Sequence, residues 1–72
     1  MPNGVRDLGQ TSIRGAILTT QSQVELQCND RSGSLFQLTM DLPNAMFLMN
    51  MLTQIQRETR AKVPVSPPDL PD

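Results

Sequence analysis

Residues 23–40 read Gln-Val-Glu-Leu-Gln-Cys-Asn-Asp-Arg-Ser-Gly-Ser-Leu-Phe-Gln-Leu-Thr-Met, and they carry the clearest structural signal in the chain. Apolar and polar side chains alternate over residues 23–29 and again over residues 36–40. Such alternation is typical of strands with one buried face and one wet face. Residues 30–34, with Gly33 among them, have the composition of a tight turn. These residues therefore predict an antiparallel hairpin.

The hydrophobic pattern also predicts the register of this hairpin. With Leu26 opposite Leu38, one face of the pair gathers six side chains, those of Val24, Leu26, Cys28, Phe36, Leu38 and Met40. A slip of one residue would turn each of them to the wrong face, so this register is strongly favoured.

A further strand is expected before the hairpin, over residues 12–20, with a turn at residues 21–22. Placing Ile17 opposite Val24 sets Gly15 opposite Leu26 and Ile13 opposite Cys28. Gly15 indicates a bulge or a close backbone approach within this strand. The result is a three-stranded antiparallel meander with residues 23–29 in its centre.

A helix is expected after the meander, from Asp41 to about Ala61. Pro43 suits the first helical turn, and Asp41 places negative charge at the positive end of the helix dipole. At 100° per residue one stripe is positioned to cover the dry face of the sheet, and it contains Ala45, Leu48, Met49, Leu52, Ile55 and Gln56. The fold class is thus α+β: a three-stranded antiparallel β-meander followed by one C-terminal α-helix packed on one sheet face.

This helix carries more apolar side chains than one stripe can hold, because Met46, Phe47 and Met51 lie outside it. Three explanations remain open. In the first, the helical phase differs from the one assumed or the chain ends cover these residues. In the second, a second copy of the chain covers them. In the third, a different protein covers them. Contiguous exposed apolar area marks contact surfaces. The candidate partner-binding residues are Met46, Phe47, Asn50, Met51 and Gln54.

The chain ends differ in composition from the middle. Residues 1–11 contain Pro2 and two glycines and are expected to form a flexible arm, and residues 12–62 form the β-β-β-α domain. Residues 63–72 hold four prolines, which cannot continue a helix, and are expected to be a disordered tail.

The residue inventory argues against several classes of function. Cys28 is the only cysteine and there is no histidine, so a thiolate nucleophile lacks a base and no metal site is expected. The acidic residues do not converge in the expected fold, so we expect neither an enzyme nor a cofactor. A net charge of −1 and only two aromatic residues argue against nucleic-acid binding. No apolar run reaches membrane-spanning length and no secretory segment is visible, which together with the single thiol favours a cytoplasmic protein.

A chain of 72 residues buries only about 60% of the surface that its unfolded form exposes, so its core is marginal, and oligomerisation is a common remedy. We therefore expect a non-enzymatic protein-interaction or regulatory module, a homodimer that contacts partners through the apolar helix patch, with another protein as a possible partner. The alternative is a structural or adaptor subunit that pairs through a sheet edge or the proline-rich tail. The pattern is too generic to indicate a family.

Overall fold

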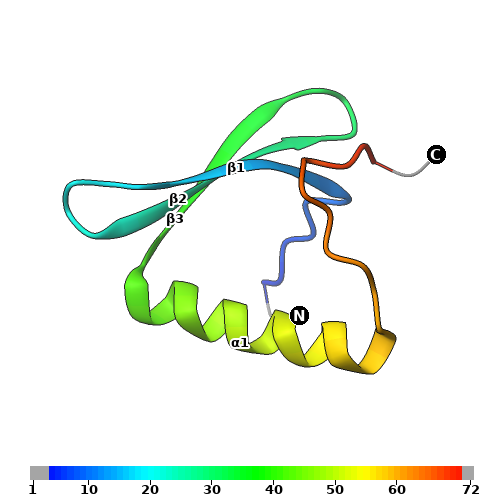
Figure 1. The fold of residues 1–72 in the computed structure, drawn as a ribbon. Helices are drawn as coiled ribbons and strands as arrows, with labels where there is room; N and C mark the ends of the chain where they lie inside the picture. The colour runs from blue at the N-terminus through cyan, green and yellow to red at the C-terminus, as the bar shows by residue number, and fades with distance from the viewer. Residues whose placement is uncertain (1–3, 71–72) are drawn as a thin grey trace.

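The computed structural model describes residues 4–70 and contains three strands and one helix (Figure 1). The strands β1 (Thr11–Leu18), β2 (Gln23–Asp30) and β3 (Leu35–Asp41) form one antiparallel sheet in the order β1-β2-β3. The helix α1 (Leu42–Thr59) follows β3 directly. This arrangement confirms the predicted α+β fold.

The second hairpin has the predicted register over its whole length, from Gln23 opposite Asp41 to Asn29 opposite Leu35. Its turn is organised by the Asp30 carboxylate, which accepts hydrogen bonds from the Ser32 hydroxyl (2.6 Å) and from the backbone N–H groups of Ser32 and Ser34 (3.0 and 2.9 Å). The hydrogen bond from the Ser32 hydroxyl is the main reason why the pKa of Asp30 is lowered. Gly33 supplies the positive φ of 90° that this turn requires.

The first hairpin departs from the predicted register. Ile13 does lie opposite Cys28, but Gly15 lies opposite Gln27 and Ile17 opposite Glu25, so the prediction is wrong beyond residue 13. The cause is a bulge at Arg14, an extra residue that shifts the ladder by one position. As a consequence Ala16 and Leu18, and not Ile17, share the face of their partners Leu26 and Val24.

The helix begins as the sequence predicts. The Asp41 side chain accepts a hydrogen bond from the Asn44 backbone N–H at 3.0 Å and another from the Asn44 amide at 2.7 Å, and a proline occupies the first turn. The backbone bond is the larger cause of the lowered pKa of Asp41. The helix ends at Thr59, two residues before the predicted Ala61, because Arg60 adopts a left-handed φ of 54°.

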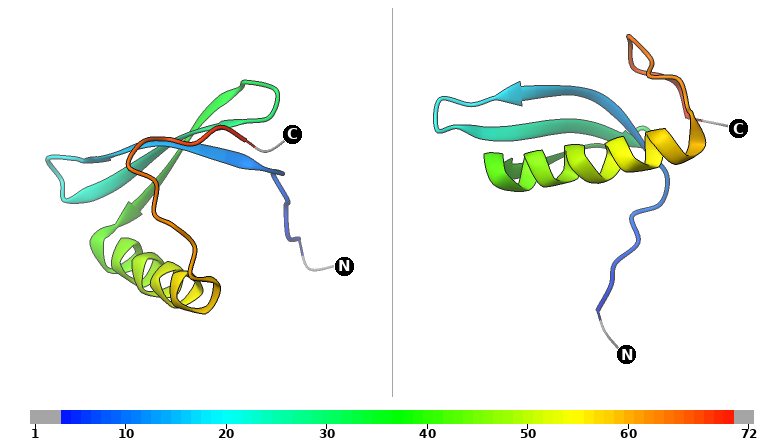
Figure 2. Two further views of the ribbon diagram at one scale, coloured as in Figure 1. Left: turned by 45° about the vertical axis from the view of Figure 1, so that its right-hand side comes forward. Right: turned by 60° about the horizontal axis from the view of Figure 1, so that its bottom comes forward.

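Packing between the helix and the sheet is sparse. The helix leaves β3 at a sharp corner and lies along one side of the sheet, from which it diverges (Figures 1 and 2). Among residues 4–70 only Cys28 and Ser12 are buried, at 1% and 6% exposure, and no residue of α1 is buried. The molecule therefore lacks a closed core between its two layers.

The segment after the helix turns back toward β1 (Figure 1). Residues from Pro64 to Pro68 lie beside residues from Ile13 to Ala16, and the Ser12 hydroxyl donates a hydrogen bond to the Pro68 carbonyl at 3.2 Å. Residues 61–70 contain no helix or strand. Their predicted flexibility, like that of the arm, stays a prediction, and residues 1–3 and 71–72 lie outside the described residues. Over residues 4–70, no helix combines the length and the apolar character needed to cross a membrane.

Candidate interaction surface

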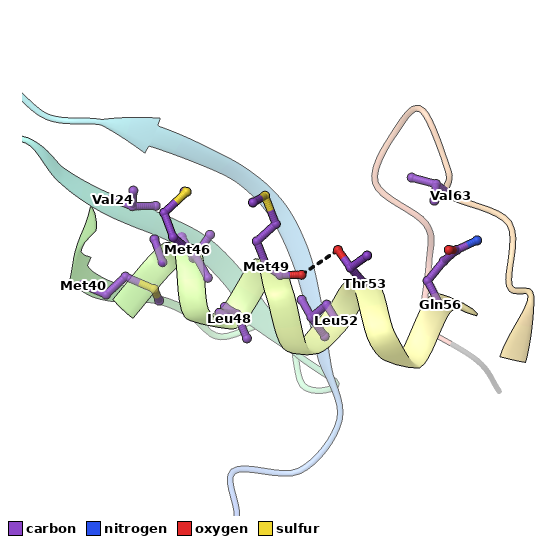
Figure 3. A pocket seen from close by; sticks show the side chains of 11 residues that line it. Val24, Met40, Met46, Leu48, Met49, Leu52, Thr53, Gln56 and Val63 are labelled. Carbon is purple, nitrogen blue, oxygen red and sulfur yellow. Dashed lines mark hydrogen bonds between the residues drawn. The ribbon is translucent and has the colours of Figure 1, made fainter. Parts of the chain in front are cut away.

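An open apolar groove separates α1 from the sheet (Figure 3). It has a volume of about 480 Å³. Its walls are side chains of β2, β3, α1 and the following segment, namely Val24, Leu26, Met40, Ala45, Met46, Leu48, Met49, Leu52, Thr53, Gln56 and Val63. Nine of these eleven side chains are apolar, so the groove is suited to apolar contact.

The two polar side chains of the groove use their hydrogen-bonding groups locally. The Thr53 hydroxyl donates to the Met49 carbonyl at 2.7 Å, within the same helix (Figure 3). The Gln56 amide donates to the Ala61 carbonyl at 3.1 Å. The groove therefore offers few groups that would orient a small polar ligand. Any partner that binds in it would be recognised through its shape and its apolar area.

A second hollow lies where β3 passes into α1. It is lined by both polar and apolar side chains, those of Gln23, Thr39, Met40, Asp41, Asn44, Phe47, Leu48 and Met51. The two hollows together place apolar surface on both flanks of the first half of the helix.

The structure divides the five predicted partner-binding residues among different places. Met46 lines the groove, whereas Phe47 and Met51 line the hollow beside β3. Asn50 and Gln54 are exposed and line neither. Phe47 is 59% exposed, so within residues 4–70 neither chain end covers it.

Sequence reasoning missed part of this surface. Met49 and Leu52 belong to the stripe that was expected to lie against the sheet, yet they are 57% and 53% exposed. The helical period correctly grouped them with Leu48, but the angle at which α1 leaves the sheet is set by the β3–α1 corner and has no signature in the pattern.

Three of the groups capable of chemistry, those of Cys28, Asp30 and Asp41, have structural roles. The Cys28 thiol is buried and lies 3.6 Å from the Leu26 carbonyl, which makes this residue a core side chain. The carboxylates of Asp30 and Asp41 are held in a turn and at a helix cap. Across the described part of the chain, no three His, Cys, Asp or Glu side chains gather where they could hold a metal ion. Comparison with protein-family models, curated proteins and solved structures finds no match to this chain.

Proposed function

We propose that this protein is a small non-enzymatic interaction module that acts as a homodimer, and that the apolar side chains of α1 form its contact surface. A regulatory or scaffolding role in the cytoplasm fits such a module. The single observation that carries the proposal is the amount of apolar surface that one copy leaves uncovered.

The accessible surface of one copy is unusually large for its mass. It amounts to 6145 Å² for 8.0 kDa. The area expected of a folded monomer of this mass is about 4,500 Å². The extended chain ends account for part of the difference, but residues of the helix and sheet contribute as well. A standard interface buries about 800 Å² on each partner, so a second copy would cover about half of this difference.

The exposed side chains have the composition of a contact surface. Methionine is enriched at protein interfaces, and its unbranched, polarisable side chain adapts to irregular partners. Met46, Met49 and Met51 are each at least 41% exposed on one helix, next to Phe47 and Leu52. Apolar side chains gathered on both flanks of one helix support association more strongly than apolar residues scattered over the whole molecule would.

Sedimentation velocity over a range of concentrations tests the proposal. We expect the mass of the purified chain to approach twice 8.0 kDa as the concentration rises. A Phe47→Ala substitution should weaken self-association at least about tenfold, because truncation of a buried interface aromatic is costly. Glu58→Ala removes an exposed side chain from the same helix and should leave the dissociation constant unchanged.

Two results would contradict the proposal. One is a sedimenting mass of 8.0 kDa at every concentration. The other is an equal dissociation constant for the Phe47→Ala and Glu58→Ala variants, which would move the contact away from α1.

A further inference from the structure

The two edges of the sheet differ in how they are protected against pairing with another strand. Along β1, the bulge at Arg14 interrupts the ladder, and the proline-containing segment from Pro64 to Pro68 lies alongside. Bulges, charges and covering segments are the devices that natural sheets use to block edge pairing. The β1 edge therefore carries the features of a closed edge.

Before its last residue, Asp41, the β3 edge has none of these devices. From Leu35 to Met40 it contains no proline and no charged residue, and its register with β2 is unbroken. In the described sheet β3 pairs with β2 alone. An edge with an unbroken register and no charged residue between Leu35 and Met40 is a ready template for a further strand.

The hydrogen bonds of the hairpin identify which groups of β3 face outward. The Asp30 backbone N–H donates to the Ser34 carbonyl at 3.0 Å, so these two residues form a hydrogen-bonded pair. Hydrogen-bonded and non-hydrogen-bonded pairs alternate along an antiparallel ladder. The backbone groups of Phe36, Leu38 and Met40 are thus directed toward β2, and those of Leu35, Gln37 and Thr39 away from it.

We propose that β3 pairs antiparallel with β3 of a second copy, about a two-fold axis that passes beside Gln37. This inference rests on the proposed homodimer and adds a strand-to-strand contact to the α1 surface proposed for it. Leu35 of each copy then lies opposite Thr39 of the other, and Gln37 lies opposite its own counterpart. Leu35, Gln37 and Thr39 all pair in this way, with about six backbone hydrogen bonds.

The side chains of this register are compatible on both faces. On the helix side Phe36 lies opposite Leu38 of the second copy, which continues the apolar face across the axis. On the other side Gln37 and Thr39 bring no like charges together. Because the axis is perpendicular to the sheet, both copies of α1 lie on the same face of a six-stranded sheet. The hollow lined by Phe47 and Met51, beside the end of β3, is then close to the junction.

Charge substitution on the axis tests the pairing, because a residue on a two-fold axis meets itself. Gln37→Lys and Gln37→Glu should each weaken dimerisation at least about tenfold through like-charge repulsion. An equimolar mixture of the two variants should restore a dimer about as tight as that of the unchanged chain. Gln27→Lys is the matched control on the central strand, where the two charges would lie about 14 Å apart, beyond the screening length at physiological salt.

Cysteine cross-linking tests the register itself. In a hydrogen-bonded antiparallel pair the Cα atoms lie about 5.5 Å apart, within the range of a disulfide. The Gln37→Cys variant should therefore form a disulfide-linked dimer under mild oxidation. Thr39→Cys, on the same edge, should not, because its two copies are offset along the strands by about 14 Å. Circular dichroism of each variant checks that the monomer fold is kept.

The outcomes separate this inference from the proposal on which it rests. If the unchanged chain dimerises but the Gln37 variants dimerise equally well, or their mixture gives no recovery, the β3 interface is wrong and the homodimer stands. If the unchanged chain is monomeric throughout, both fail. Cross-linking of Thr39→Cys in preference to Gln37→Cys would contradict the register.

Discussion

At the scale of single residues, Asp41 links the two layers of the molecule. It is the last residue of β3 and the N-cap of α1, and its carboxylate accepts the Asn44 backbone N–H at 3.0 Å. The cap satisfies one of the amide groups that the first helical turn leaves without a partner. Because the bonds favour the ionised carboxylate, the pKa of Asp41 is lowered in the folded chain.

The lowered pKa of Asp41 predicts a dependence of stability on pH. A carboxylate with a depressed folded pKa contributes stability that is present above its unfolded value of 3.8 and is lost as the pH falls through the folded value. Asparagine is also an effective helix cap, so the Asp41→Asn variant should unfold at nearly the same temperature as the unchanged chain at pH 7. In acid it should lose less stability than the unchanged chain does. Thermal melts at pH 7 and pH 3 check this. Asp41→Ala should melt several degrees lower already at pH 7, and an unchanged melting temperature there would exclude a role for the cap.

At the scale of elements, β1 shows why a glycine within a strand is ambiguous in sequence. Gly15 correctly indicated an irregularity, but the extra residue is Arg14. Gly15 itself has no positive φ, and a Cβ atom built on it would meet nothing within 4 Å. The bulge therefore does not depend on glycine at this position.

This geometry predicts opposite effects for two glycine substitutions. Gly15→Ala should raise the free energy of unfolding by roughly 0.5 kcal/mol, because alanine has less backbone freedom to lose on folding. Gly33→Ala is the matched comparison. It should lower the free energy of unfolding by about 1 kcal/mol or more, because the φ of 90° at residue 33 is strained for a residue with a Cβ atom. Urea denaturation of both variants measures the difference. Destabilisation by Gly15→Ala would mean that the bulge requires a conformation reserved for glycine.

At the scale of the whole molecule, the segment after the helix completes the β1 side of the sheet. Pro68 accepts the hydrogen bond of Ser12, the only polar residue that is buried between residues 4 and 70. Val63, at the start of the same segment, lines the groove beside α1. The segment thus contacts both layers of the molecule.

Removal of residues 63–72 should therefore uncover the β1 edge. We expect the truncated chain to form species larger than the dimer, because an uncovered strand edge is available for further pairing. Light scattering coupled to gel filtration measures this change. Removal of residues 69–72 alone retains Pro68 and its hydrogen bond and should leave the assembly state unaltered. If the longer truncation behaves like the shorter one, the segment does not protect this edge.

The predictive power of the sequence was greatest where structure depends on neighbours along the chain. Alternation with a period of two predicted both strands and the full register of the second hairpin, and Asp41 and Pro43 marked the start of the helix. The apolar excess around Phe47 was likewise visible in the pattern. For these features the physical cause is local, since backbone geometry and side-chain period are set within a few residues.

Other features followed from contacts between distant parts of the chain. The bulge at Arg14, the divergence of α1 from the sheet and the position of Pro68 beside Ser12 have no periodic signature. They depend on how whole elements pack against one another. One extra residue in β1 exchanges the two faces of that strand, and the angle between β3 and α1 leaves a groove beside the helix. For this reason the sequence indicated that apolar surface would be left over on the helix. Only the folded chain showed that Met49 and Leu52 belong to this surface, and only the folded chain distinguished the open β3 edge from the covered β1 edge.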